Sequence, residues 1–492
     1  MNKSKISLIV VFSFQLIAIL LAVFRILPRE AILISTGITV FYFIFSPLED
    51  GLFLFIISIP VFAAMSITEE FDTMANWRIL LAILFLIWFF RRKWPLLKKD
   101  LLSRPCCPLK FKIRSNLIKW TFIFLGIGAL SVFIAENPIA AIKKLLFLLN
   151  IFLLFVIVKD LAKQEEERKK IIRAAIFSLS IILLFGYLQL ISVFWVPFYS
   201  FWQWWAENVI SVFYGANLSQ TLKISNTWFS YYPDKLPTLR MFSLFPDSHS
   251  FALFALIGLI FLVYALKTDY KIRKNLIWAL IGLCIFALMF SGSRGIWLAG
   301  ILPFFAILFF YVFRDKKTLR PFFIILVIFA ISFPFSSLIL SLSRGGGDAT
   351  LAFQRAKSIT DMEEISVKSR LGIWKSSFSS ILKHPLLGVG IGNYPLVLGE
   401  DISAAKRGAS AHNLYLDIVS ETGIIGLFAF IFILILIFKK ALKSAKSNEY
   451  YAISFLFFFV WILFYNLFDV VLFNDKVLLF FMVTLGVLYR DE

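Results

Sequence analysis

The sequence is poor in the residues that build metal sites and disulfide frameworks. Only 3 of its 492 residues are histidine and only 3 are cysteine. Cys106 and Cys107 are adjacent in a basic segment and Cys284 lies in an apolar run, so neither a disulfide nor a paired-cysteine metal site is indicated. The HExxH and Walker A motifs are missing, as is an Asp-x-Asp motif in the predicted outer segments. We therefore predict a reaction that uses no metal and no cofactor.

Charged residues are scarce as well. They make up 16% of the chain, against 60% hydrophobic residues, and the mean hydropathy is +0.86. So few polar side chains cannot cover a soluble globular protein. A spanning helix needs roughly 20 mostly apolar residues, and runs such as 424–438 are too long for the strands of a barrel. The sequence predicts an all-α polytopic membrane protein with about 12–14 transmembrane helices.

The predicted spans divide the chain into parts that lie in the membrane and parts that lie outside it. These parts are N-terminal transmembrane helices (1–196), an outer loop with an interfacial helix (197–249), central transmembrane helices (250–340), a long, partly helical outer loop (341–411) and C-terminal transmembrane helices (412–492). The interfacial helix follows from aromatic and polar residues that share a helical period after Pro197, although these aromatics also fit a plain aromatic belt. The first span is too long for a signal peptide, so we expect it to be retained.

The excess of basic residues, a formal net charge of +20, is concentrated in short loops between predicted spans. These loops are 91–115, 159–173, 267–274, 314–320 and 439–448. Basic loops stay in the cytoplasm, which places both chain termini there. The charge is thus accounted for by topology and by the anionic headgroups of the bilayer, and no nucleic acid partner is expected. The outer loop 341–411 is also net positive, contrary to the topology rule, which invites a functional explanation.

Arginines stand at unusual places on the predicted outer surface. Arg240 precedes a span, Ser293 and Arg294 belong to a polar run between two apolar helices, and Arg370 lies in the long outer loop. A charge near hydrocarbon costs about 2.5 kcal/mol or more on insertion scales, so such residues usually have a partner. Guanidinium groups bind phosphate oxygens through paired hydrogen bonds, which favours a diphosphate ligand. Contact with lipid phosphates for Arg294, and simple solvation for the other two, remain alternatives.

His412 is a candidate general base, because a neutral imidazole can accept a proton near physiological pH. If one helix begins at His412, Gly423 lies about three turns later and almost directly below it, with Gly426 nearby. These small residues would let a neighbouring element pack closely beneath the histidine. A capping or buried structural histidine is the alternative.

The other two histidines have weaker signals. His384 precedes Pro385 and a turn that contains Gly388 and Gly390, where it can either position a sugar or phosphate or bend the chain. His249 belongs to Asp-Ser-His-Ser, which resembles a helix start that Asp or Ser would cap, and we rank capping above chemistry there.

Four ordered elements between about residues 240 and 430 resemble the O-antigen ligase and polymerase superfamily. They are Arg240 with Asp247-Ser-His249, then Ser-Gly-Ser293-Arg294-Gly-x-Trp297, then Arg370, Trp374 and His384-Pro-Leu-Leu-Gly388-Val-Gly390, and then His412-Asn413-x9-Gly423-x-x-Gly426.

The resemblance implies a glycosyltransferase of GT-C-like fold. Such enzymes transfer a glycan from undecaprenyl diphosphate to an acceptor such as lipid A-core, at the periplasmic face of the cytoplasmic membrane. Arg240 and Arg294 resemble the diphosphate-binding arginines and His412 the essential histidine, while Arg370 and His384 are further substrate-binding candidates. Ser293, Gly388, Gly390, Asn413, Gly423 and Gly426 would be structural residues of the motifs.

Other functions fit the same sequence. A polymerase of O-antigen or exopolysaccharide, and a protein O-oligosaccharyltransferase, belong to the same superfamily and would use the same donor. A lipid-linked oligosaccharide flippase or transporter is less favoured. Transporters place ionisable groups near the membrane midplane between repeats, whereas here the polar runs gather on one predicted face and no repeat is found.

Overall fold

The computed structural model describes residues 3–66, 73–95, 98, 115–223, 228–231, 236–268, 272–303, 305, 316–343, 350–360, 365–399 and 410–491. Within these ranges the regular secondary structure is helical except for two short antiparallel hairpins, which confirms the predicted all-α membrane class. Cys106, Cys107, most of the basic loop 91–115 and residues 400–409 of the outer loop lie outside the described residues.

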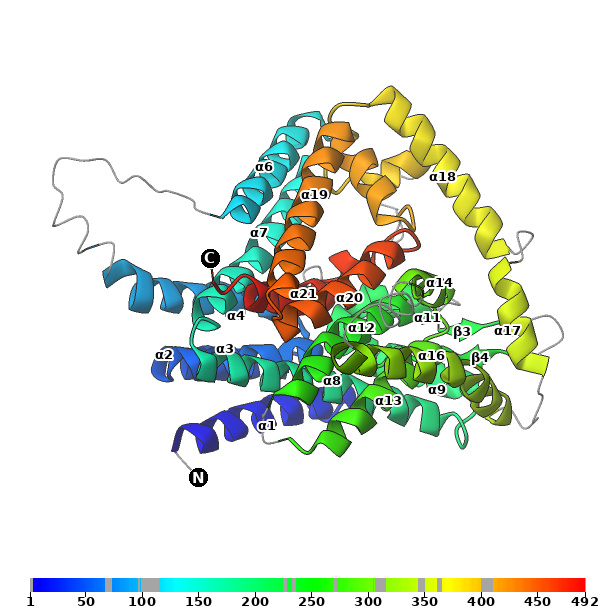
Figure 1. Cartoon of the computed structure of the whole chain (residues 1–492), viewed down its shortest axis with the longest axis horizontal. Coiled ribbons are helices and arrows are strands. Elements are labelled where there is room, and N and C mark those ends of the chain that lie inside the picture. Colours follow the sequence, from blue (N-terminus) through cyan, green and yellow to red (C-terminus); the bar gives the residue numbers. More distant parts are fainter. Residues whose placement is uncertain are drawn as a thin grey trace.

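The helices follow one another along the whole chain (Figure 1). The N-terminal helices are α1 (Lys3–Val23), α2 (Ala31–Phe45), α3 (Leu48–Ser58), η1 (Ile59–Val61), α4 (Trp77–Trp88), η2 (Phe89–Lys93), α6 (Asn116–Ser131), η3 (Val132–Ile134), α7 (Pro138–Leu161) and α8 (Glu165–Ser192). The central helices are α9 (Phe198–Trp204), η4 (Trp205–Ile210), α10 (Ser211–Tyr214), α11 (Ala216–Lys223), α12 (Ser248–Lys267), α13 (Lys274–Phe290), α14 (Arg294–Ala299), α16 (Lys316–Leu342), α17 (Thr350–Thr360) and α18 (Ile365–Lys383). The C-terminal helices are η5 (Tyr394–Leu398), α19 (Leu414–Lys446), α20 (Tyr450–Tyr465), η6 (Val471–Phe473) and α21 (Asp475–Leu488). The hairpins pair β1 (Ala64–Met65) with β2 (Met74–Ala75) and β3 (Phe229–Ser230) with β4 (Thr238–Leu239).

Among the described residues, 7 helices are long and apolar enough to cross a membrane. They lie in α1, α6 with η3, α7, α8, α12, α16 and α19. Three shorter apolar helices, α2, α13 and α20, also coincide with apolar runs for which the sequence predicts spans, at about 31–45, 275–291 and 450–469. The orientation of these helices in the bilayer stays a prediction from the distribution of Lys and Arg.

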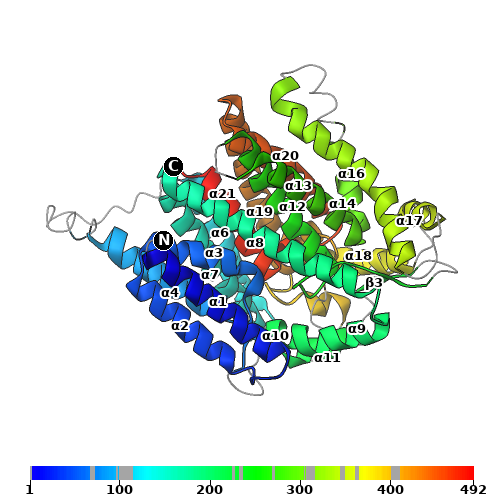
Figure 2. The ribbon, with the colours of Figure 1, turned by 90° about the horizontal axis from the view of Figure 1, so that it is seen from below.

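Helix α12 forms the centre of the bundle. It is apolar on every side, as expected of a helix with no surface face, and nearly all of its residues are buried. It packs against α8, α13, α20 and α21, which surround it in Figure 2. Because Asp247 precedes the first turn of α12, this buried helix fixes one side of the functional site described below.

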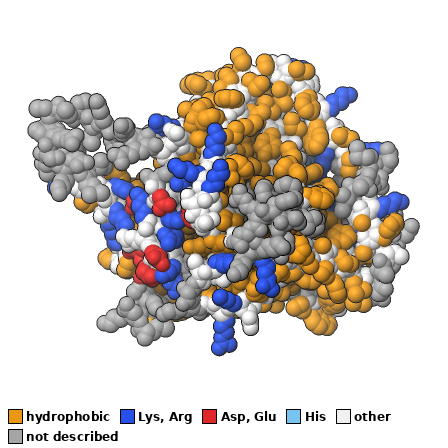
Figure 3. Space-filling view, in the orientation of Figure 1, with side chains coloured by type: hydrophobic (Ala, Val, Ile, Leu, Met, Phe, Trp, Pro, Cys, Tyr) orange, Lys and Arg blue, Asp and Glu red, His pale blue; other side chains and the backbone are white. Residues whose placement is uncertain are grey.

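Both chain ends lie on one side of the molecule, while α17 and α18 lie on the opposite side (Figure 1). The face drawn in Figure 3 is largely hydrophobic, and its Lys, Arg, Asp and Glu side chains gather mainly toward the side of the chain ends. The predicted outer loop 341–411 contains α17, α18 and η5 together with the turn 384–393, so its described part is partly helical, as expected. The predicted interfacial segment likewise forms α9, η4 and α10, in which Trp202 and Trp205 are buried and Tyr199 is exposed.

Helix α19 differs from the prediction of one continuous helix that starts at His412. It begins at Leu414, and the side chain of Asn413 caps it by accepting hydrogen bonds from the backbone N–H groups of Tyr415 and Leu416. Gly423 then interrupts it with φ 68° and ψ −174°. His412 and Gly423 therefore do not lie on one face of a continuous helix, as had been predicted, because the helix begins after His412 and is interrupted at Gly423.

Candidate functional site

Arg240 and the polar run before α14 lie against each other. Hairpin β3–β4 ends at Arg240, whose backbone N–H donates to the carbonyl of Trp228, and its Nε donates to Ser230 Oγ at 2.8 Å. The side chain crosses Gly292, because a Cβ atom there would lie 3.0 Å from Arg240 Cγ. The next residues are Ser293, the N-cap of α14, and Arg294, its first residue. The hairpin and the start of α14 thus bring these two predicted arginines to one region.

His249, Asp469 and His412 form a cluster beside this region. His249 Nδ1 lies 3.0 Å from Ser293 Oγ, 3.2 Å from the Tyr465 hydroxyl and 3.2 Å from Asp469 Oδ2. The other carboxylate oxygen of Asp469 lies 3.9 Å from His412 Nδ1, too far for a hydrogen bond but close enough for strong attraction to an imidazolium. One carboxylate therefore stands between two of the three histidines of the chain.

Asp469 is buried between α20 and α21 but remains ionised. Burial alone raises the pKa of Asp469, but His249, His412 and Arg370 outweigh burial and hold that pKa below its usual range.

Asp247, at the N-cap of α12, is the opposite case. Burial and the charge of Asp469 raise the pKa of Asp247 to about 6, although Ser250 donates to it through its backbone N–H and its hydroxyl. The site therefore holds one carboxylate whose pKa is lowered, Asp469, and one whose pKa is raised into the mildly acidic range, Asp247.

His412 is the accessible histidine of the cluster. Its side chain is 41% exposed, whereas that of His249 is 22% exposed and has three polar neighbours. Nδ1 of His412 makes no hydrogen bond with any described residue. Its backbone has φ 48°, a conformation that non-glycine residues seldom adopt and that is often retained at functional sites. His412 is thus the member of the cluster that a substrate can reach.

The surroundings of His412 hold its unusual backbone in place. The backbone N–H of Ala411 donates to Asp417 Oδ1, and Trp374 Nε1 donates to the Ala411 carbonyl at 2.9 Å. After the histidine, the Leu414 N–H donates to the Asn466 carbonyl at 2.8 Å. Trp374 lies on α18, one turn after Arg370 on the same face. Helix α18 therefore supports His412 and brings Arg370 close enough to act on Asp469.

The glycine motifs build a junction between the 384–393 turn and the interruption of α19. Val389 and Gly390 donate their backbone N–H groups to the carbonyls of Ser420 and Glu421, and Ile424 donates to the Pro385 carbonyl. A Cβ atom at Gly423 would collide with the carbonyl oxygen of Leu386, and one at Gly388 with that of Ser420. Both glycines also have positive φ. These positions thus allow two backbone segments to meet directly. Gly426 is buried one turn further on, against Thr422.

Charged residues are buried next to this junction. Lys144 of α7 forms an ion pair with Glu421 at 2.5 Å, and Asp417 lies one turn before Glu421 on α19. Both acids are almost fully buried. Asp417 and Glu421 lie in the part of α19 that precedes Gly423, so these buried charges help to hold in place the segment that follows His412.

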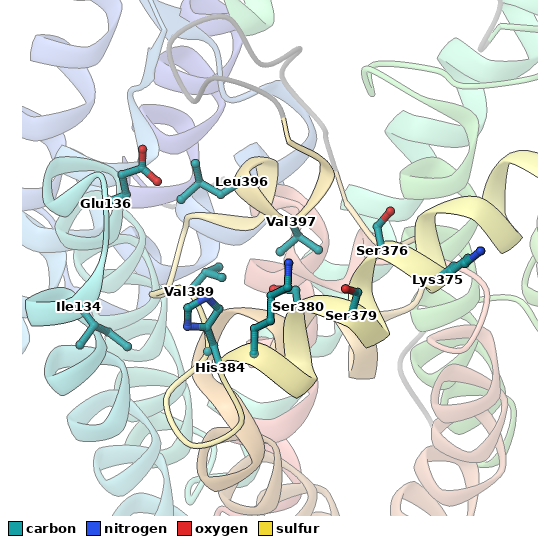
Figure 4. A pocket seen from close by; sticks show the side chains of 12 residues that line it. Ile134, Glu136, Lys375, Ser376, Ser379, Ser380, His384, Val389, Leu396 and Val397 are labelled. Atoms are coloured by element: carbon teal, nitrogen blue, oxygen red, sulfur yellow. The ribbon is translucent and has the colours of Figure 1, made fainter.

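His384 does not join the histidine cluster. It follows the last residue of α18, 14 positions after Arg370, which corresponds to about 21 Å along the helix axis. Its exposed side chain lines a separate cleft of about 750 Å³ between α18, η3 and η5 (Figure 4). The structure thus gathers Arg240, Ser293, Arg294, Arg370 and His412 around one region and places His384 in another.

Asp469 and Tyr465 were not predicted as site residues from the sequence, and His249 was predicted to belong to a helix cap. Asp247 does cap α12, as expected, but the imidazole of His249 points into the cluster. Asp469 could have been noticed in the sequence, because it is a charged residue between two apolar segments. The same argument, that a charge near hydrocarbon is costly, had been applied to Arg294. Among the described residues, no group of three or more His, Cys, Asp or Glu side chains could hold a metal ion, and metal independence stays a prediction.

Comparison with known proteins gives one family match. The model of the family described as O-antigen ligase matches residues 278–431, which include Arg294, Arg370, His384 and His412. No curated protein matches the chain. Arg240, His249 and Asp469 lie outside the matched range but contact or adjoin residues within it. Residues 278–431 match the O-antigen ligase family model, which confirms the resemblance to the O-antigen ligase and polymerase superfamily.

Proposed function

We propose that the protein is an integral membrane glycosyltransferase that transfers a glycan from undecaprenyl diphosphate to an acceptor such as lipid A-core. The reaction would take place at the periplasmic face of the cytoplasmic membrane. A polymerase that uses a second lipid-linked glycan as acceptor, or a protein O-oligosaccharyltransferase, is the alternative within the same superfamily. The observation that carries the proposal is the Asp469 carboxylate between His249 and His412, with Arg370 acting on the same carboxylate.

In this mechanism the acceptor hydroxyl oxygen attacks the anomeric carbon of the donor. The bond from that carbon to the diphosphate oxygen breaks, and the diphosphate leaves with the electron pair. With Nδ1 of His412 directed toward Asp469, Nε2 is left to take the proton of the attacking hydroxyl. Asp469 stabilises the imidazolium that forms, while His249, Ser293 and Tyr465 hold Asp469 and its surroundings in position.

The arginines would act on the leaving group. Arg294 begins α14 next to Ser293, and Arg240 crosses Gly292 two residues earlier. Two guanidinium groups in this position can stabilise the negative charge that develops on the diphosphate without a metal ion. Attack from the side opposite to the diphosphate inverts the anomeric configuration.

The experiment is glycan transfer by the purified protein in lipid nanodiscs. The donor is an undecaprenyl-diphosphate-linked glycan, and the acceptors are lipid A-core in one arm and a second lipid-linked glycan in the other, which separates ligase from polymerase. We expect His412→Ala and Arg294→Ala to abolish transfer while the proteins insert into membranes normally. Arg173→Ala, which removes an exposed arginine of α8, should retain full activity. Full activity of either site variant would reject the proposal.

A further inference from the structure

The cleft that contains His384 is a second polar site on α18. Its lining includes Lys375, Ser379, Lys383 and His384 from α18 and its end, with Glu136 from the link between η3 and α7 on the other side. Figure 4 shows Glu136 and Ile134 across the cleft from Ser379 and Ser380. The side chains of both lysines and of Glu136 form no ion pair or hydrogen bond with the side chain or backbone of a described residue. The cleft therefore has charged groups and hydroxyls that the fold itself does not use.

Helix α18 presents this cleft and the histidine cluster on opposite faces. Arg370, Trp374 and Ser377 recur at helical spacing on the inner face, where Ser377 contacts the Tyr394 hydroxyl at 2.7 Å. Ser376, Ser379 and Lys383 recur with the same spacing but lie about 150° further round the helix. Lys383 is 13 residues beyond Arg370, or about 20 Å along the axis. The cleft thus begins beside the site of transfer on another face of α18 and extends away from it along the helix.

We infer that this cleft binds the carbohydrate chain of a glycan substrate, a few sugar units from the reacting linkage, and that it favours a chain with acidic substituents. Serine hydroxyls can donate to and accept from sugar hydroxyls, and lysine ammonium groups bind carboxylates or phosphates. With Lys375 and Lys383 against Glu136, the charged residues of the lining sum to +1 with His384 neutral. Val389, Leu396 and Val397 add apolar surface that can cover the non-polar faces of sugar rings.

The inference rests on the proposed function, because the chain of a lipid-linked glycan must lead away from the diphosphate toward an open surface. The lining residues on α18 are mostly exposed, and the cleft opens to the outside of the molecule. A rigid helix that forms the wall of both sites would set the distance between the reacting linkage and the sugars that are held. The cleft would therefore select substrates by the composition of the chain and not by the linkage that reacts.

The test measures binding separately from transfer. The probe is the water-soluble oligosaccharide released by mild acid from the lipid-linked glycan of the cells that make the protein, titrated into the full-length protein in nanodiscs. We expect Lys375→Ala/Lys383→Ala to weaken binding about tenfold, as for two solvent-exposed charge contacts. Reduction of the carboxyl groups of the probe should weaken its binding to the wild type by a similar factor. Lys143→Ala removes an exposed lysine of α7 outside the cleft and should change nothing.

The outcomes test two claims separately, that the cleft binds glycan and that the protein transfers glycan. Weaker binding by the double variant, with transfer from a donor that carries a very short glycan preserved, supports the cleft as a glycan site. Equal binding by wild type and double variant, or binding of the probe by neither, overturns it, even when transfer proceeds normally. If the lysines instead respond to the content of phosphatidylglycerol in the nanodisc and not to the oligosaccharide, the cleft holds lipid headgroups and the inference is wrong. Absence of transfer alongside intact glycan binding would reject the proposed function and leave the cleft in place.

Discussion

Replacement of Asp469 by asparagine tests the proposed mechanism most directly, because it removes one negative charge and almost no volume. In the wild type, Oδ1 of Asp469 lies 3.9 Å from His412 Nδ1. Two unit charges at this distance attract by about 4 kcal/mol at an effective dielectric constant of 20. His412 is partly exposed, which reduces the attraction, so the imidazolium formed during transfer should lose about 2–4 kcal/mol of stabilisation. That loss corresponds to a decrease of about 30- to 1000-fold in kcat.

The assay is single-turnover glycan transfer by Asp469→Asn, His412→Ala and the double variant. If Asp469 acts through His412, the double variant should be no slower than His412→Ala alone, since residues that act as a unit are not additive. Asp160→Asn is the matched control, because Asp160 is likewise a carboxylate with two side-chain partners, Trp88 and Lys93, but none of the cluster residues contacts it. Multiplied losses in the double variant, or a decrease below threefold in Asp469→Asn, would refute the role assigned to Asp469.

Three further substitutions test the framework of the site. In a thermal unfolding assay, Gly423→Ala should destabilise the protein by about 3 kcal/mol or more. The reasons are the positive φ of Gly423, the collision of a Cβ atom with the Leu386 backbone and the loss of hydrogen bonds at the junction. Gly372→Ala is the control, because a Cβ atom there meets nothing within 4 Å, and it should be neutral or stabilising. Asp247→Asn should remove a pH dependence: burial raises the folded-state pKa of Asp247 to about 6, so its ionisation lowers wild-type stability as the pH rises from about 4 through 6, by up to about 3 kcal/mol. The Asn variant, which can still cap α12, should therefore gain Tm relative to wild type at pH 8 and not at pH 4, and an equal difference at both pH values would contradict this. Glu421→Gln should cost about 3 kcal/mol by leaving Lys144 buried without its ion-pair partner, and Lys144→Met in the same protein should recover most of that loss in unfolding measurements.

Helix positions could be predicted from the sequence because they depend on local hydrophobicity. Apolar runs of sufficient length identified α1, α6, α7, α8, α12, α16 and α19 with their approximate bounds. The motifs also led to the prediction that His412 and Arg370 are site residues, because polar groups beside a bilayer are costly and usually have a partner or face a cavity. Lone polar residues near the ends of predicted spans are therefore informative even without coordinates.

The composition of the cluster could not be predicted, because it depends on which helices become neighbours. His249, His412 and Asp469 are separated by more than fifty residues in each case, and only the packing of α12 and α19 against α20 brings them together. The interruption at Gly423 was missed for a related reason. A GxxG pattern fits a closely packed continuous helix as well as a broken one, and only the backbone of residues 385–390 shows which applies here.

The interruption of α19 reconciles its length with the thickness of a bilayer. The 33 residues of this helix would extend about 50 Å if unbroken, against a hydrocarbon core of about 30 Å. After Gly423, residues 424–446 measure about 35 Å, close to what a slightly tilted span requires. The remaining turns carry Asp417 and Glu421, which would be expensive in lipid. We therefore expect the segment before Gly423 to lie outside the hydrocarbon and to hold the His412 imidazole near the phosphates of lipid-linked substrates.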